Sequence, residues 1–142
     1  MRTEITAGPE ETARLGEDLA RRLGPGSVVA LTGELGAGKT CLASGIARGL
    51  GVRERYLPSP TFVLAREYAG RLPLYHLDFY RLGKGADFRG LGLDEYLFGE
   101  GVTVIEWADR APELIPPGAV AVELEYLDGC RRRIKIHESP RD

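Results

Sequence analysis

One short segment, residues 33–40, constrains the fold of this chain more than any other. It reads Gly33-Glu-Leu-Gly-Ala-Gly-Lys-Thr40 and fits the pattern G-x-x-x-x-G-K-[ST] at every position. Residues 27–32 before it form an apolar run rich in β-branched side chains, which is typical of a buried strand. Residues 39–50 have helical spacing and are followed by a glycine. A buried strand, a glycine-rich turn and a helix in this order predict a loop that wraps phosphate groups.

The residue types in this loop suit a nucleotide. Backbone N–H groups bind the polyphosphate, and glycine lets the backbone come close to it with positive φ. The N-terminal dipole of the next helix favours the same anion. We expect Lys39 to be exposed in the turn, with its ammonium group available to the β- and γ-phosphates, and Thr40 to offer a hydroxyl group to Mg²⁺. In a chain of this composition, chance gives about 0.004 matches to the pattern.

Length and composition predict one α/β domain. The chain has 142 residues, of which 43% are hydrophobic and 28% charged, so we expect residues 1–142 to form a single domain. The spacing of apolar residues predicts a helix over residues 10–23, strands over 62–67, 72–79 and 102–106, and a short helix near 93–98. This order of elements predicts a P-loop NTPase-like, mainly parallel central sheet flanked by helices.

The last two predicted strands, residues 120–126 and 132–137, pair as an antiparallel C-terminal hairpin. Their apolar side chains stand at even-numbered positions in both strands. Directly opposed residues share a face, so the loop must hold an odd number of residues, and residues 128–130 fit best. This register places Glu125 opposite Arg133 and Glu123 opposite Lys135, and opposite charges on the wet face support it.

Charge and composition exclude several classes of protein. Nineteen Lys and Arg against 21 Asp and Glu give a net charge of −2, so no chain-wide basic field indicates DNA binding. The longest uncharged stretch, residues 23–33, is too short to span a bilayer, and residues 1–6 lack an apolar leader, so we expect no membrane partner. Cys41 and Cys130 are too few for a disulfide framework or a metal cluster. A cytoplasmic location follows as the default.

The chain contains no Asn and no Gln. A guanine-reading Asn-Lys-x-Asp motif is therefore excluded, and so is a Gln that positions the attacking water as in Ras-type GTPases. We expect the base to be adenine, selected by the shape of its pocket.

Two acidic residues stand where predicted strands end. Asp78 closes residues 72–79, and Glu106 closes residues 102–106. Ligands of open α/β sheets bind at the carboxyl ends of the strands, so beside a phosphate loop we expect both acids to act on a metal ion or on water. Plain solvated acids are the alternative. The residue types leave open which of the two binds Mg²⁺ directly.

Four other features have a structural and a functional interpretation. His76 shares a strand face with Asp78, and we interpret it as a hydrogen-bonded structural residue rather than a ligand. Cys41, in the first helical turn, is expected to pack rather than to react. Arg81 either senses phosphate or forms a surface ion pair. Residues 131–133 are three arginines that we interpret as a solvated face rather than an RNA contact.

Taken together, the motifs resemble those of the bacterial TsaE (YjeE) family over almost the whole chain. The ordered set consists of residues 33–40, Ser59-Pro-Thr-Phe62, His76-Leu-Asp-Phe-Tyr-Arg81 and Glu106-Trp107, preceded by Thr12-x-x-Leu15-Gly16. The resemblance implies a small P-loop ATPase required for N6-threonylcarbamoyladenosine at position 37 of tRNA. It implies TsaB- and TsaD-like partner proteins, with TsaD as the transferase. It also implies contact with tRNA only through their complex, which ATP hydrolysis would reset between turnovers.

The same resemblance implies roles for individual residues. Lys39, Thr61, Asp78 and Glu106 would form the catalytic set, in which Thr61 senses the γ-phosphate and Asp78 lies beside the metal and the attacking water. Thr40 and Glu106 would hold Mg²⁺, and Trp107 would lie near the site. The implied ATP contacts are Pro9, Thr12, Gly33, Glu34, Leu35, Gly36, Ala37, Gly38, Lys39, Thr40, Cys41 and Asp78. Cys41 departs from the family pattern, in which a second Thr or Ser is common.

Two other functions fit a phosphate loop. A small-molecule kinase would need an acceptor pocket and an arginine-bearing lid, for which Arg81 and Arg89 are candidates. A non-hydrolysing, ATP-dependent scaffold would need no catalytic acids, so the presence of Asp78 and Glu106 argues against it.

Overall fold

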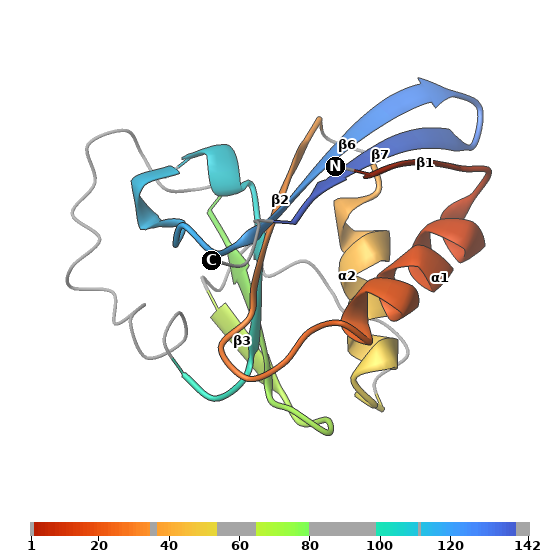
Figure 1. The fold of residues 1–142 in the computed structure, drawn as a ribbon. Helices are drawn as coiled ribbons and strands as arrows, with labels where there is room; N and C mark the ends of the chain where they lie inside the picture. Colours follow the sequence, from red (N-terminus) through yellow and green to blue (C-terminus); the bar gives the residue numbers. More distant parts are fainter. Residues whose placement is uncertain (1, 35–36, 54–64, 80–98, 111, 139–142) are drawn as a thin grey trace.

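The computed structural model describes residues 2–34, 37–53, 65–79, 99–110 and 112–138. Its helices and strands, in chain order, are β1 (Arg2–Thr6), α1 (Pro9–Ala20), β2 (Val28–Gly33), α2 (Lys39–Gly49), β3 (Ala65–Tyr68), β4 (Leu74–Asp78), β5 (Val102–Glu106), two 3₁₀ turns (Ala108–Arg110 and Pro112–Leu114), β6 (Val120–Asp128) and β7 (Arg131–His137). Within these residues the strands form one seven-stranded sheet in the order β1-β7-β6-β2-β5-β4-β3 (Figure 1).

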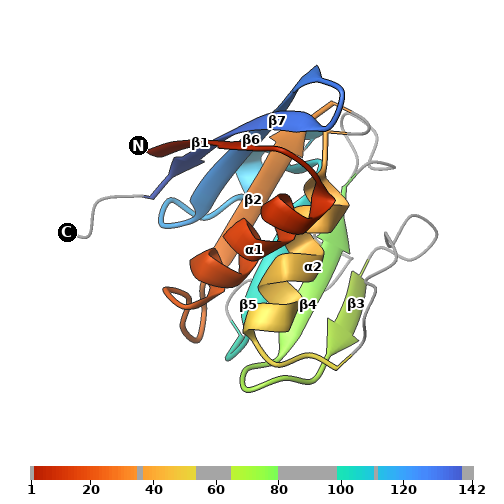
Figure 2. The same ribbon diagram turned by 90° about the vertical axis from the view of Figure 1, so that its right-hand side faces the viewer.

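Parallel strands occupy the centre of the sheet and antiparallel strands its edges. The strands β6, β2, β5 and β4 run parallel to one another, whereas β3 and the β7–β1 pair are antiparallel. Both α1 and α2 cover the same face of the sheet (Figure 2). The predicted fold class, a mainly parallel α/β sheet with helices against it and an antiparallel C-terminal hairpin, is confirmed.

The sheet has an apolar core on each face. On the helix side, α1 and α2 pack against the sheet through buried side chains such as Leu19, Leu42 and Val104. On the other side, Leu77, Phe79 and Ile105 form a smaller cluster. Burying each such side chain contributes roughly 1.5–3 kcal/mol. Because strand residues alternate between faces, the positions next to Leu77 and Ile105 face the helices.

Two glycines hold the helices close together. A Cβ atom at Gly16 on α1 would overlap the backbone of Leu42 on α2, and one at Gly45 would overlap the backbone of Ala13. The absence of side chains there brings the middle of α1 against the first two turns of α2. No helix in the described ranges combines the length and the apolar character that crossing a bilayer requires.

The predicted elements match the observed ones with differences at their ends. The helix predicted over residues 10–23 ends at Ala20, and residues 21–23 continue as a tighter turn in which each N–H donates to the carbonyl three residues earlier. The strand β1 was not predicted, and it pairs with β7 to form the edge of the sheet. The predicted helix near residues 93–98 and the strand start at residues 62–64 lie outside the described residues.

The predicted register of the C-terminal hairpin is confirmed, but its predicted loop is wrong. Glu125 stands opposite Arg133 and Glu123 opposite Lys135. The turn contains two residues, 129 and 130, rather than three, because Asp128 already pairs with Arg131. Leu127 is an extra residue in a bulge between Tyr126 and Asp128, and this residue supplies the odd count that the parity requires.

Candidate nucleotide-binding site

Three parallel strands bring the predicted acids and the phosphate loop together at one edge of the sheet. Glu106 at the end of β5 pairs in register with Leu31 on β2 and with Asp78 on β4. Both acids face the helix side, and they are 2% and 6% exposed respectively. The first turn of α2, which begins at Lys39, lies over the same strand ends. Asp78 and Glu106 are therefore buried neighbours, and the plain solvated alternative is wrong for both.

The ends of the phosphate loop need glycine. Gly33 has φ +149°, and a Cβ atom there would lie 2.5 Å from the carbonyl oxygen of Leu124 on β6. Gly38 precedes α2 in the left-handed region, with φ +101°. Other side chains strain at such angles, so the loop can turn sharply from β2 into α2 only with glycine at these positions. Leu35 and Gly36 lie outside the described residues.

Lys39 is buried, contrary to the sequence-based expectation of an exposed side chain. It is 5% exposed, and its Nζ atom donates to the carbonyl oxygens of Gly33 at 2.6 Å and Glu34 at 2.9 Å. The same atom lies 4.0 Å from the centroid of the Trp107 ring. The Lys39 ammonium group is buried because the carbonyl groups of the loop accept its hydrogen bonds and the face of the indole ring packs against it.

Burial lowers the pKa of Lys39, and nearby acids oppose that shift. Removal from water is the largest cause, and the carboxylates of Glu106, Asp109, Asp78 and Glu34 act in the other direction. The ammonium group thus stands within a ring of acids close to where phosphates would enter. This field favours a cation at the position, and an anionic ligand would strengthen that preference.

Trp107 combines a strained backbone with a defined contact. It has φ +59°, and among the described residues it is the only non-glycine residue with positive φ. This conformation costs roughly 1–2 kcal/mol for a residue with a side chain. It directs the indole ring out of the β5 line and against Lys39, with the guanidinium group of Arg110 at 5.7 Å from the ring centroid. Strain of this kind is common at functional sites.

Glu106 and Thr40 form the pair that best fits a magnesium-bound nucleotide. The hydroxyl group of Thr40 donates to Glu106, at 3.2 Å from Oε1 and 3.4 Å from Oε2. The described residues contain no group of three or more His, Cys, Asp or Glu side chains that could hold a metal by themselves. Magnesium is usually held by one or two protein oxygens together with phosphates and water, so this oxygen pair suits it.

His76 contacts the same carboxylate from the other side. Its Nε2 atom lies 2.5 Å from Oε2 of Glu106, and the ring is 0% exposed. The hydrogen bond expected of His76 is confirmed. The sequence had not indicated its partner, because the contact depends on the pairing of β4 with β5.

Thr12, in the first turn of α1, lies beside the end of the glycine-rich loop. A Cβ atom at Gly38 would lie 3.8 Å from Cγ2 of Thr12. Thr12 is buried; its hydroxyl group donates to the carbonyl of Gly8 at 3.2 Å and lies 2.7 Å from the hydroxyl group of Thr6 on β1. Sequence reasoning missed Thr6, because only the pairing of β1 with β7 brings it here. Pro9 is exposed at the first position of α1.

The structure gives less information on the remaining predicted site residues. Ala37 is buried, and Cys41 is half-buried and carries a free thiol, which fits the packing role expected for it. Thr61, Arg81 and Arg89 lie outside the described residues, and their roles stay predictions.

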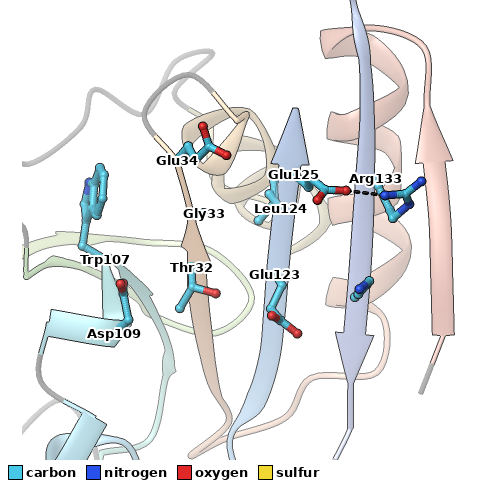
Figure 3. Close-up of a pocket in the computed structure, with 10 residues that line it drawn as sticks. Thr32, Gly33, Glu34, Trp107, Asp109, Glu123, Leu124, Glu125 and Arg133 are labelled. Carbon is cyan, nitrogen blue, oxygen red and sulfur yellow. Dashed lines mark hydrogen bonds and ion pairs between the residues drawn. The ribbon is translucent and has the colours of Figure 1, made fainter. Parts of the chain in front are cut away.

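A pocket of about 530 Å³ opens beside the loop. Figure 3 shows Trp107 and Asp109 on one side of β2 and the hairpin residues on the other. Its lining residues are Thr32, Gly33, Glu34, Trp107, Asp109, Glu123, Leu124, Glu125, Arg133 and Lys135. Two acids in it form ion pairs: Glu125 with Arg133 and Glu123 with His137. A solvated face was predicted for residues 131–133, and Arg131 fits it, because it is exposed and pairs with Asp128. Arg132 and Arg133 are half-buried, and the guanidinium group of Arg132 lies 4.7 Å from the centroid of the Tyr126 ring.

Comparison with known proteins decides the family. A sequence model described as "Threonylcarbamoyl adenosine biosynthesis protein TsaE" matches residues 6–134. The chain belongs to the TsaE family. The matched range contains the phosphate loop, both acids, His76 and Trp107, and it confirms the resemblance seen in the motifs.

Individual members of the TsaE family agree with this assignment. A Treponema pallidum protein named tRNA threonylcarbamoyladenosine biosynthesis protein TsaE is 44% identical, covering 93% of this chain and 97% of its own. The Bacillus subtilis protein of the same name is 42% identical, covering 91% and 80%. The crystal structure of Bacillus subtilis YdiB superposes with a TM-score of 0.80 at 35% identity, covering 95% of this chain and 83% of that one.

Proposed function

We propose that this member of the TsaE family binds ATP with Mg²⁺, hydrolyses it to ADP and phosphate, and thereby supports threonylcarbamoyladenosine formation at position 37 of tRNA. The pathway follows from the names of the family and its relatives. One geometric observation supports the chemistry best: Thr40, at the start of α2, donates to the buried carboxylate of Glu106 directly beside a glycine-rich phosphate loop.

The loop residues bind and orient the nucleotide. Backbone N–H groups between Gly33 and Thr40, with the N-terminus of α2, would hold the β- and γ-phosphates. Lys39 would leave the carbonyls of Gly33 and Glu34 and donate to the phosphates, which are stronger acceptors than neutral carbonyls. Thr12 would lie beside the nucleoside end, because it adjoins Gly38.

The acids would serve the hydrolytic step. Thr40 and Glu106 would hold Mg²⁺, which neutralises charge developing on the transferred phosphoryl group. Asp78, one strand away and in register with Glu106, would orient the attacking water. The ring of Trp107 would keep bulk water from the phosphates on the side where it now covers Lys39.

ATP hydrolysis would act on the state of partner proteins, and the phosphate would go to water rather than to a small acceptor molecule. We propose that the chain works in the cytoplasm with TsaB- and TsaD-like proteins, that the TsaD-like protein transfers the threonylcarbamoyl group, and that tRNA is contacted through the complex. The net charge of −2 supports this assignment, because a protein that binds tRNA by itself usually presents a basic face.

The experiment is a phosphate-release assay on purified protein, alone and with TsaB- and TsaD-like proteins and tRNA. We expect ATP turnover, loss of turnover in Lys39→Ala, and modified tRNA only when ATP is hydrolysed. Transfer of phosphate to a small acceptor would instead identify a kinase. Full tRNA modification with a non-hydrolysable ATP analogue would identify a scaffold and contradict the proposal.

A further inference from the structure

The side chain of Glu106 is held from two elements at once. Thr40 on α2 donates to it from one side, and His76 on β4 contacts Oε2 at 2.5 Å from the other. His76 is 0% exposed and Glu106 is 2% exposed. A carboxylate without fixed partners rotates about its side-chain bonds, whereas partners on two different elements restrict it to one orientation.

The hydrogen positions on His76 follow from its surroundings. Nδ1 is buried and has no hydrogen-bond partner among the described residues. A proton on Nδ1 alone would leave a buried donor unpaired and would direct the Nε2 lone pair at a carboxylate oxygen, and both arrangements are unfavourable. The Nε2–H group therefore donates to Glu106.

Strand pairing makes this contact rigid. Register places His76 opposite Val104 and Asp78 opposite Glu106, so the histidine reaches the acid diagonally across two parallel strands. Thr40 on α2 also donates to Oε2, at 3.4 Å, so the carboxylate has one partner on the helix and one on the sheet. The contact from His76 belongs to the sheet and is present in the protein without nucleotide.

We propose that His76 is a positioning residue that fixes the Glu106 carboxylate for a magnesium-bound nucleotide. The inference rests on the proposed function, in which Glu106 and Thr40 hold the metal. Groups that hydrogen-bond a metal ligand typically change metal affinity or activity by about 10- to 100-fold when they are removed. His76 acts through Glu106 and touches neither the nucleotide nor the metal in this scheme.

Three substitutions separate positioning from plain packing. His76→Leu places an apolar side chain of similar size at this position and removes the Nε2–H donor. His76→Gln places an amide N–H near the position of Nε2, whereas His76→Asn carries the same amide on a shorter side chain that does not reach Glu106. The Gln and Asn variants are a matched pair, because they differ in reach and share their chemistry.

The readout is the affinity for a non-hydrolysable ATP analogue, measured by calorimetry with Mg²⁺ and with EDTA. In the wild type we expect Mg²⁺ to strengthen binding. In His76→Leu and His76→Asn this gain should fall by about 10-fold or more while the affinity in EDTA stays within about twofold. His76→Gln should retain most of the gain. Circular dichroism establishes that each variant is folded, and the Gln and Asn pair decides the matter if His76→Leu does not fold.

Two outcomes of the calorimetry would overturn the inference, and they distinguish its failure from the failure of the proposed function. If the wild type shows the magnesium gain and all folded variants keep it, His76 is only a packing residue and the proposed function stands. If the wild type shows no gain from Mg²⁺, the metal role of Glu106 fails first and the inference falls with it. Nitrogen-15 NMR of the His76 ring gives an independent check in the free protein: a proton on Nδ1 and none on Nε2 would contradict the inference.

Discussion

The carboxyl ends of the central strands and the β6–β7 hairpin both carry acids and bases, but water reaches them very differently. At the strand ends, Lys39, Glu106 and Asp78 are all buried. On the hairpin, Glu125 and Arg133 form an ion pair in which the side chains are 55% and 39% exposed respectively. The same residue types thus stand in two environments of one sheet.

This difference in burial distinguishes charges that need compensating partners in the protein from charges that water solvates. Burying a charge is unfavourable unless partners compensate for lost hydration, and removing one partner of a buried pair typically costs about 3–5 kcal/mol. Exposed pairs contribute little, because water and salt screen them. Under the proposed function, the buried charges beside the glycine-rich loop serve the chemistry, and the exposed pairs of the hairpin do not. The predictions below test this contrast, from the largest effect to the smallest.

Glu106→Ala is expected to have the largest effect. It should bind nucleotide, because the backbone loop and Lys39 remain, yet hydrolyse ATP about 10²-fold more slowly or worse. Asp78→Ala should show the same separation of binding from turnover. The matched control is Asp128→Ala on the hairpin, an exposed acid outside the pocket lining, which should hydrolyse ATP at the wild-type rate in the same phosphate-release assay. Normal hydrolysis by Glu106→Ala would remove the distinction between the two regions.

Lys39→Ala is expected to weaken ATP binding by about 10- to 100-fold, because a charge-assisted hydrogen bond contributes about 1.5–3 kcal/mol. The fold should persist, since the helix and the strand ends stay packed. Arg131→Ala on β7, an exposed basic residue outside the pocket lining, is the control and should bind ATP normally by calorimetry. Equal affinities for both folded variants would refute the phosphate loop.

Gly33→Ala is expected to lower the free energy of unfolding by about 1–3 kcal/mol, because it strains the backbone at φ +149° and drives a methyl group against the Leu124 carbonyl. ATP affinity should fall as well. Gly118→Ala, where a Cβ atom would meet nothing within 4 Å, should change stability by under about 0.5 kcal/mol. Urea denaturation measures both. A Gly33→Ala protein as stable as Gly118→Ala would show that the loop tolerates a side chain.

The hairpin should show the smallest effect. A hydrogen bond from Arg131 holds the pKa of Asp128 below its ordinary value of 3.8, and the pair is fully exposed. A carboxyl group with a lowered folded-state pKa stabilises the protein above its unfolded pKa, and this contribution disappears as pH falls through the folded pKa. Asp128→Ala should therefore be slightly less stable than wild type at pH 7, and the difference should shrink as the pH falls below 3.8. Urea titrations that show a large difference, or one that grows towards low pH, would contradict this assignment.

Much of the fold could be predicted from the sequence, because local patterns determine it. The strand over residues 102–106 was predicted with its observed ends, and alternation alone gave the hairpin register of Glu125 with Arg133. The glycine-rich turn between β2 and α2 was predicted because glycines at this spacing, between a buried strand and a helix, allow the backbone to turn with positive φ. Both acids were identified because parallel strands end at the same edge.

The remaining features depend on contacts between distant segments. The strand β1 has only Thr6 buried, so its sequence lacks the apolar signal of a strand. The burial of Lys39 depends on Trp107, which follows β5 and is distant in the sequence. The contact of His76 with Glu106 depends on the register of β4 with β5. A three-residue turn, and a two-residue turn with one bulged residue at Leu127, give the same pairing of Glu125 with Arg133. Counting the residues between the strands therefore could not distinguish these two arrangements.

The most direct test of the central claim is a crystal structure with Mg²⁺ and a non-hydrolysable ATP analogue. The account predicts β- and γ-phosphates within the loop of residues 33–40 and Lys39 Nζ moved from the Gly33 and Glu34 carbonyls to the phosphates. It also predicts the Thr40 hydroxyl on the metal, with the Glu106 carboxylate on the metal or on one of its waters. A nucleotide bound elsewhere, or both Glu106 and Asp78 turned away from the metal and its waters, would contradict it.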